Sequence, residues 1–222
     1  MTKYICIEGG EGSYKSTTVA ELAEYYRLNG KRVLTTKEPG TSHLPITMEL
    51  RELMLSNEYT DDLSTLSREL ISQAIRSIHL KKLIEPELES GYYDYIIQDR
   101  GMLSGIVYAL ACGVDPYLLC NLYRGMLEDS PMKYDQIFTL QNLNGGLELA
   151  KSSKSEFEGG DAMESMGVQF HNKVNADFVK YTTNPEYLEL DGFPEFCKKF
   201  HMVDVTDRNT MWIMRTITKE IR

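Results

Sequence analysis

A glycine-rich segment near the N-terminus has the residue types and spacing to bind phosphate. Gly9-Gly10-Glu11-Gly12-Ser13-Tyr14-Lys15-Ser16 follows a short apolar run, and Thr17 continues it into a helical pattern. At the N-terminus of a helix, backbone N–H groups and the positive end of the helix dipole attract anions. Lys15 would reach the terminal phosphates of a nucleotide, and the Ser16 hydroxyl would bind Mg²⁺. We therefore predict that this segment binds a polyphosphate.

The segment departs at one position from the phosphate-loop pattern G-x-x-x-x-G-K-[ST]. Gly9, Lys15 and Ser16 match it, but Tyr14 stands where the pattern has its second glycine. Glycine suits that position because it permits unusual backbone angles and a close approach to phosphate. A strained tyrosine would cost about 1–3 kcal/mol there. The alternative is a glycine-rich turn with a helix-capping lysine that binds no nucleotide.

The elements that would position this segment alternate between strands and helices. Short apolar runs predict five strands, at Tyr4–Glu8, Arg32–Thr36, Tyr95–Gln98, Gln136–Leu140 and Met202–Val205. The helices are expected near Lys15–Leu28, Leu44–Leu55, Ser64–Ser90, Met102–Ala111, Pro116–Glu128, Met163–Tyr181 and Asp207–Ile221. Pro86 can kink or break the third of these helices, and Thr206 or Asp207 is expected to cap the last. This alternation is typical of a parallel sheet covered on both faces.

Composition narrows the function without deciding it. The chain has 222 residues, with 24 Lys+Arg against 33 Asp+Glu and a formal net charge of −9. With no Lys/Arg-rich block, nucleic acid and membrane surfaces are not expected as partners. We find no linker or repeat, so residues 1–222 are interpreted as one domain. Residues 142–161 are rich in Gly, Ser, Lys and Glu, and are expected to form a mobile lid.

Cysteines and histidines argue against disulfides and zinc. They are scattered, with no Cys-x-x-Cys pair, at Cys6, Cys112, Cys120, Cys197, His43, His79, His171 and His201. No apolar run approaches the roughly 20 residues of a membrane-spanning helix. The N-terminal residues turn acidic too early for a secretory signal. We therefore expect a reduced, cytoplasmic protein.

Several motifs, taken in order, resemble those of thymidylate kinases, within the P-loop nucleoside monophosphate kinases. Ile7–Gly12 resembles the opening I-E-G-x-[DE]-G, and Thr36–Thr41 resembles T-R-E-P-G-G-T with a lysine for the arginine. Asp99-Arg100 matches a D-R motif after the third strand. Further matches in the same order are Arg51, Arg76, Glu164, Phe170, Asn172 and Lys173. The resemblance implies a P-loop NTPase-like three-layer α/β sandwich, with a five-stranded parallel sheet flanked by helices.

The resemblance also implies a reaction. ATP would donate its γ-phosphoryl group, with Mg²⁺, to the 5′-phosphate of a deoxynucleoside monophosphate, with dTMP to dTDP as the leading candidate. Lys15 and Ser16 would serve the donor, Asp99 would support the metal or Arg100, and Glu11 would lie near the acceptor sugar and the transferring phosphate. The acceptor phosphate would be bound by Arg51, Arg76 and Arg100, because guanidinium groups match phosphate oxygens.

The acceptor-base pocket departs from the family pattern. The implied substrate set also includes Pro39, Ser72, Ser104, Gly105 and Tyr108. Ser72 replaces the phenylalanine that family members stack on thymine, and such a stack contributes roughly 1–3 kcal/mol per base. Gly105 and Ile106 replace polar residues after Ser104, while Gln73 and His79 flank Arg76 at helical spacing. Two alternatives therefore stay open, a kinase for another or modified deoxynucleotide and a catalytically weak nucleotide-binding protein.

The expected lid has no arginine. None occurs between Gly125 and Asp207, and Ala162 falls where the family pattern has one. We predict that Lys151 takes its catalytic role, with Lys154 as the other available cation, although a solvated charged loop is the alternative. Family members are commonly homodimers that pack long helices together. Apolar positions within Leu63–Leu88 would form that face, unless they belong to the core.

Overall fold

Five parallel strands form one sheet at the centre of the molecule. The computed structural model describes residues 1–128, 130, 132–142 and 166–221. In sheet order, the strands are β2 (Val33–Lys37), β3 (Tyr95–Asp99), β1 (Lys3–Gly9), β4 (Gln136–Gln141) and β5 (Phe200–Asp204). Every neighbouring pair is parallel, and each strand overlaps its predicted range. The expected five-stranded parallel sheet is confirmed.

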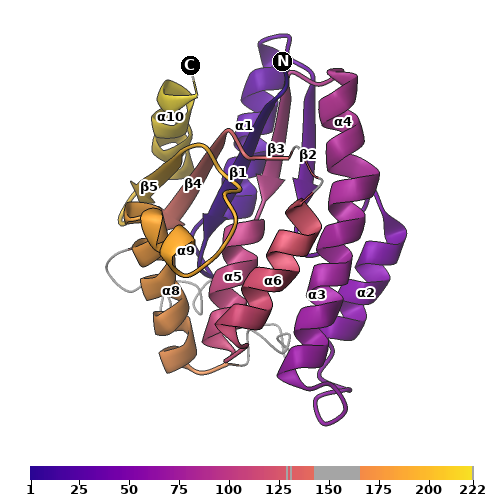
Figure 1. The fold of residues 1–222 in the computed structure, drawn as a ribbon. Coiled ribbons are helices and arrows are strands. Elements are labelled where there is room, and N and C mark those ends of the chain that lie inside the picture. Colours follow the sequence, from indigo (N-terminus) through magenta and orange to yellow (C-terminus); the bar gives the residue numbers. More distant parts are fainter. Residues whose placement is uncertain (129, 131, 143–165, 222) are drawn as a thin grey trace.

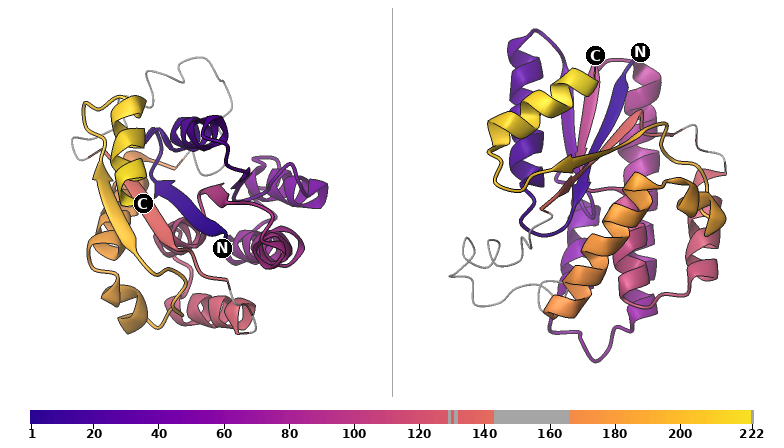
Figure 2. Two further views of the ribbon diagram at one scale, coloured as in Figure 1. Left: turned by 90° about the horizontal axis from the view of Figure 1, so that it is seen from above. Right: turned by 90° about the vertical axis from the view of Figure 1, so that its left-hand side faces the viewer.

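Helices cover both faces of this sheet, as Figures 1 and 2 show. Alternate residues of the central strand enter different cores, because side chains in a strand point to opposite faces in turn. Tyr4 and Cys6 pack with α5 (Met102–Ala111), α6 (Pro116–Leu127) and α8 (Val168–Thr183). Ile5 and Ile7 pack with α1 (Lys15–Leu28) and α10 (Thr210–Glu220). The three-layer sandwich is therefore confirmed.

The long helix expected over Ser64–Ser90 is interrupted. It consists of α3 (Thr65–His79), a π-helical turn (Leu80–Ile84) and α4 (Glu85–Ser90), and it packs beside α2 (Pro45–Leu55). Pro86 has no N–H to donate, and its ring would clash with the carbonyl four residues earlier in a regular helix. The wider turn before it removes that conflict. The helix is therefore distorted just before Pro86, but it continues to Ser90 rather than breaking there.

The predicted start and the predicted cap of the last helix were wrong. The last helix begins at Thr210, and the Asn209 side chain caps it by accepting a 2.9 Å hydrogen bond from the Trp212 N–H. Asp207 has φ +54°, which a right-handed helix does not permit, so the helix cannot include this residue. Because its first residue is Thr210, neither Thr206 nor Asp207 is the cap. A short helix that was not predicted, α9 (Glu186–Leu190), follows α8.

Part of the chain falls outside the described residues. The predicted lid lies there except for Asn142, and so do Lys151, Lys154, Ala162 and Glu164. Within the described part, α8 begins at Val168, five residues after the predicted start. No helix among the described residues is long and apolar enough to cross a membrane.

Candidate active site

The glycine-rich segment connects the end of β1 to the start of α1. Its backbone lies so close to its neighbours that side chains would collide. A Cβ atom on Gly9 would lie 2.2 Å from the Leu140 carbonyl oxygen of β4, and one on Gly10 would lie 2.2 Å from Asn175 Oδ1 of α8. Gly9 and Gly12 also have φ of +137° and +71°, values that favour glycine. These glycines therefore seat the loop against β4 and α8.

Tyr14 adopts the backbone conformation of the glycine that it replaces. Its φ and ψ are +63° and +16°, which is the left-handed region, and it directly precedes α1. An L-residue pays about 1–2 kcal/mol for that conformation. The residue is 43% exposed, so its bulk is accommodated at the surface. The backbone strain considered from the sequence is confirmed.

Lys15 is buried within the loop and bonded to it. Its ammonium donates hydrogen bonds to the Gly10 carbonyl and, at 3.2 Å, to Ser13 Oγ. Burial, helped by the positive charge of Arg100, lowers the pKa of Lys15 to about 7. Phosphate oxygens would be stronger acceptors for this ammonium than a carbonyl and a hydroxyl are.

Ser16 and Asp99, both predicted to bind Mg²⁺, are in direct contact. The Ser16 hydroxyl donates a 2.6 Å hydrogen bond to Asp99 Oδ2, and Lys37 Nζ lies 4.0 Å from the same oxygen. Asp99 Oδ1 is buried and has no hydrogen-bond partner among the described residues. Oxygen donors from a hydroxyl and a carboxylate are those that Mg²⁺ prefers. The donor set therefore fits magnesium, and the unpartnered oxygen is available to it or to its water.

Arg100 joins the phosphate loop to the end of β3. Its guanidinium forms a 2.6 Å ion pair with Glu11 and donates a 3.1 Å hydrogen bond to the Gly9 carbonyl. The guanidinium carbon lies 5.2 Å from the ring centre of Tyr108, whose buried hydroxyl has no partner among the described residues. Three predicted site residues, Glu11, Arg100 and Tyr108, are thus brought together.

Glu8 has a role that sequence reasoning missed. Its buried carboxylate accepts hydrogen bonds from the N–H groups of Gly101 (2.9 Å) and Ser104 (3.1 Å), and also from the Ser104 hydroxyl. These groups belong to the first turn of α5, where an anion is favourable, and burial raises the pKa of Glu8. Ser104, predicted to contact substrate, is here held by Glu8. A charged residue inside an apolar strand was the available signal.

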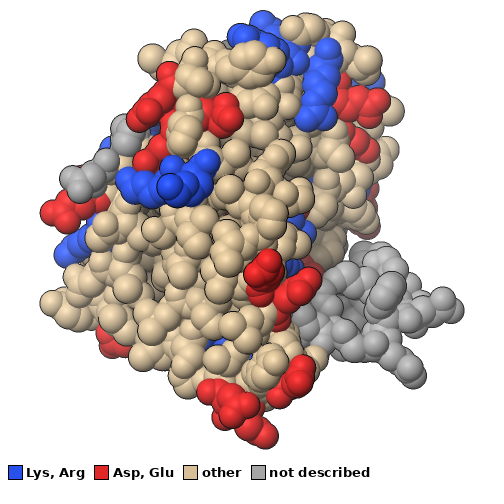
Figure 3. Space-filling model, turned by 90° about the vertical axis from the view of Figure 1, so that its right-hand side faces the viewer, with Lys and Arg blue, Asp and Glu red and all other residues tan. Residues whose placement is uncertain are grey.

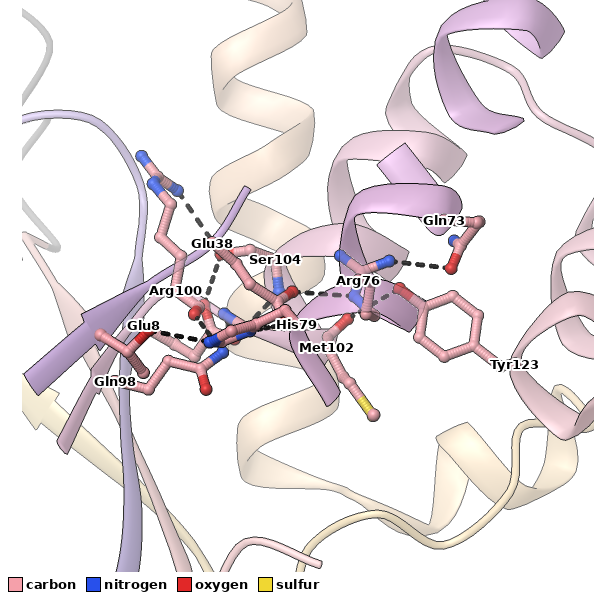
Figure 4. Close-up of polar contacts among 12 residues, drawn as sticks. Glu8, Glu38, Gln73, Arg76, His79, Gln98, Arg100, Met102, Ser104 and Tyr123 are labelled. Atoms are coloured by element: carbon pink, nitrogen blue, oxygen red, sulfur yellow. Dashed lines mark hydrogen bonds and ion pairs between the residues drawn. The ribbon is translucent and has the colours of Figure 1, made fainter. Parts of the chain in front are cut away.

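The other two predicted arginines lie on α2 and α3. Arg51 donates a 2.8 Å hydrogen bond to the Pro39 carbonyl. Arg76 is only 3% exposed, and it donates to Glu38 Oε2 at 2.8 Å and to Gln73 Oε1 at 2.9 Å (Figure 4). Burial alone would raise the pKa of Glu38, but its ion pair with Arg76 and its contact with His79 outweigh burial and lower that pKa. Both arginines are therefore held by the turn after β2.

Gly105 provides space for the Arg76 guanidinium. A Cβ atom at this position would lie 2.3 Å from Arg76 Nη2 and 2.3 Å from the Tyr123 hydroxyl. The Arg76 guanidinium carbon lies 5.2 Å from the Tyr123 ring centre. The absence of a polar side chain at Gly105 is thus a packing requirement of this chain. Ser72 lies one turn before Arg76 on α3 and is half-buried.

Comparison with known proteins agrees with this geometry. The family model for thymidylate kinase matches residues 7–191. The chain belongs to the thymidylate kinase family. A thymidylate kinase from Sulfurihydrogenibium sp. is 28% identical over 195 residues, which cover 86% of this chain and 90% of the relative. One from Magnetococcus marinus is 31% identical over 181 residues, covering 80% and 81%.

A solved structure supports the fold independently. The crystal structure of thymidylate kinase from Ehrlichia chaffeensis superposes with a TM-score of 0.68 at 22% identity, covering 100% of this chain and 99% of that chain. Family membership confirms the predicted enzyme class, a nucleoside monophosphate kinase. The predicted reaction, ATP-dependent phosphorylation of dTMP to dTDP, is the one that the family and its curated members support.

Proposed function

We propose that this chain transfers the γ-phosphoryl group of ATP to dTMP with the residues gathered at the ends of β1 and β3. The observation that carries this assignment is the 2.6 Å ion pair between Arg100 and Glu11. Through this pair a cation from the end of β3 lies against the phosphate loop, which supports a role for Arg100 between the donor and the acceptor phosphates. Phosphoryl transfer needs mainly such positioning and neutralisation of charge.

On the donor side, the backbone N–H groups of the loop and the Lys15 ammonium bind the polyphosphate. Lys15 exchanges its contacts with Gly10 and Ser13 for phosphate oxygens. Ser16 and Asp99 would hold Mg²⁺, which neutralises phosphate charge when it is bound. Their 2.6 Å contact and the unpartnered Asp99 Oδ1 support this assignment.

On the acceptor side, Arg100, Arg51 and Arg76 orient the 5′-phosphate of dTMP, and Glu11 keeps Arg100 in place. Pro39, Ser72, Ser104, Gly105 and Tyr108 complete the proposed pocket. Lys151 remains our candidate for the third cation around the transferring group. It lies outside the described residues, so its role rests on the sequence.

A coupled assay of ADP release over a panel of deoxynucleoside monophosphates tests this function. We expect the highest kcat/KM with dTMP. Arg100→Ala should lower kcat/KM about 100-fold or more, because it removes charge stabilisation at the reacting groups. Arg32→Ala is the matched control, since Arg32 precedes β2 and pairs with Asp94 before β3, at the end of the strands opposite to the site. Faster turnover of a monophosphate with another base would overturn the assignment of dTMP as substrate. No turnover with any acceptor would overturn the assignment of kinase activity.

We further propose a homodimer that packs α2 and α3 of one subunit against those of its partner. Four large apolar side chains on these helices are exposed, namely Ile46, Leu53, Leu66 and Leu70. Their spacings of seven and four residues place each pair on one helix face. Figure 3 shows few charged side chains over the middle of this side of the molecule. A face with exposed apolar side chains and few charges favours association.

A cytoplasmic location stays a proposal that rests on the cysteines. All four are free, and three of them are buried. Burial raises the pKa of the Cys6 and Cys197 thiols, which keeps them protonated and unreactive. This state suits a reducing compartment.

A further inference from the structure

A chain of buried polar contacts runs behind the acceptor-side arginines. His79, the last residue of α3, is 1% exposed. Its Nδ1 lies 3.0 Å from Glu38 Oε1, and its Nε2 lies 2.8 Å from Thr36 Oγ1. Thr36 Oγ1 in turn donates a 3.2 Å hydrogen bond to Thr41 Oγ1. His79 therefore contacts the turn of residues 36–41 at Glu38, and through Thr36 it reaches the end of the turn.

This turn contacts both arginines. Glu38 uses its second carboxylate oxygen for the 2.8 Å ion pair with Arg76, and the Pro39 carbonyl accepts the hydrogen bond from Arg51. The backbone at Gly40 packs directly on the Arg51 side chain, since a Cβ atom there would lie 3.1 Å from Arg51 Cβ. A rotation of the Glu38 carboxylate would therefore move the partner of Arg76, and a shift of the turn would move the partners of both guanidinium groups.

We propose that His79 is a positioning residue for the acceptor phosphate. Its contact with the Glu38 carboxylate (Figure 4) fixes this group and the turn after β2, and through them Arg76 and Arg51. In this role His79 acts through these residues and does not bind the substrate itself. The inference rests on the proposed function, in which these two arginines bind the phosphate of dTMP. Small errors in the placement of such groups are costly because phosphate is recognised by fixed guanidinium geometry.

The physical basis is that a buried carboxylate requires its hydrogen bonds. Glu38 is 1% exposed, so it cannot replace a lost donor with water freely. Without His79, Glu38 Oε1 would have no hydrogen-bond donor among the described residues, and only Arg76 would hold the carboxylate. A buried acceptor left without its partner is penalised. It would reorient toward other donors, and Arg76 would lose its alignment.

Steady-state kinetics of His79→Leu tests this role. We expect KM for dTMP to rise about tenfold or more, while KM for ATP stays within about twofold, because the phosphate loop makes none of these contacts. His79→Gln, whose amide can restore one hydrogen bond, should recover part of the loss. A residue needed only for folding would lower Tm and leave KM for dTMP unchanged.

Thr36→Val provides a second arm should His79→Leu fail to fold. The substitution is nearly isosteric and removes the hydroxyl that contacts both His79 and Thr41. It should raise KM for dTMP selectively, but less strongly than His79→Leu. His201→Leu is the matched control. This mostly buried histidine lies in β5, at the opposite edge of the sheet from β2, and stacks on Phe138 with ring centres 4.5 Å apart. It should leave both KM values unchanged.

Arg51→Ala separates this inference from the proposed function. An unchanged KM for dTMP in Arg51→Ala would overturn the phosphate-binding role on which the inference rests. A raised KM in Arg51→Ala, with only Tm affected in His79→Leu and Thr36→Val, would overturn the role of His79 alone. If both roles are correct, the double variant His79→Leu/Arg51→Ala should raise KM for dTMP by less than the product of the two single increases, since the effects of coupled residues are not additive.

Discussion

At the scale of single residues, Tyr14 stores strain that a substitution can release. Its left-handed backbone costs about 1–2 kcal/mol of folding free energy. Glycine would remove this strain, but it loses roughly 0.5–1 kcal/mol of the gain because its unfolded state has more conformational freedom. Tyr14→Gly should therefore stabilise the protein by about 0.5–1 kcal/mol, or about 2–4 °C in Tm at most. Tyr14→Ala keeps the Cβ atom and should give no such gain. Equal stabilisation by alanine would show that the exposed ring, rather than the backbone, is responsible.

Lys15 makes ATP binding depend on pH. Its pKa is lowered to about 7 by burial, and bound phosphates would raise it again, so the complex binds a proton that the free enzyme lacks. Affinity for ATP should therefore be greatest below about pH 7 and weaken as pH rises above it. Calorimetry at pH 8 in two buffers of different ionisation enthalpy should detect proton uptake. Lys15→Arg should abolish it, because arginine stays protonated.

Residues inside contiguous motifs could be predicted from the sequence, and residues that act through distant partners could not. Lys15, Ser16 and Arg100 follow buried strands in recognisable patterns. The role of Glu8 depends on Ser104, 96 residues away, and that of His79 on Glu38, 41 residues away. From the sequence, Gly105 only replaces a polar residue of the family pattern. In the structure, the Arg76 guanidinium occupies the space beside it. Such pairings arise only when the fold brings distant helices, strands and turns together.

At the scale of elements, hydrophobic periodicity and helix breakers were sufficient for most boundaries. The predicted ranges of α1 and α5 match the structure. The start of α10 was missed because Thr206, Asp207 and Asn209 are all residue types that cap helices. Only the backbone distinguishes them, since Asp207 lies in the left-handed region.

The cap of α10 can be tested by unfolding in urea. Asn209→Ala should lower the free energy of unfolding by about 1 kcal/mol, because it removes the acceptor for the Trp212 N–H. Asp207→Gly is the control, since glycine accepts a positive φ and no cap is lost. A larger loss of unfolding free energy in Asp207→Gly than in Asn209→Ala would instead support Asp207 as the cap, as predicted from the sequence.

At the scale of the whole molecule, the alternation of strands and helices predicted the parallel sandwich, but not the order of its strands. That order follows from which apolar surfaces pack together, and no local pattern encodes it. The net charge of −9 argues against polyanionic surfaces as partners, and this stays a prediction. Within the site, Lys15 and Arg76 are buried beside specific partners.

The proposed dimer can be dissociated by charge. Leu66→Glu combined with Leu70→Glu should convert a dimer into a monomer in analytical ultracentrifugation, because burying two carboxylates in an apolar interface is strongly unfavourable. Leu190→Glu, at an exposed leucine of α9, is the matched control and should leave the mass unchanged. A monomeric wild-type protein would contradict the proposal.

The central place of β1 in the sheet has a consequence for biosynthesis. Its neighbours are β3 and β4, and both follow it in the chain, so β1 leaves the ribosome before either strand that it pairs with. At typical synthesis rates the roughly 90 residues up to β3 take about 5–20 s. During that interval the apolar residues Ile5, Cys6 and Ile7 have no strand to pair with. The yield of folded kinase in a cell should therefore depend on how well nascent-chain chaperones shield the N-terminal strand.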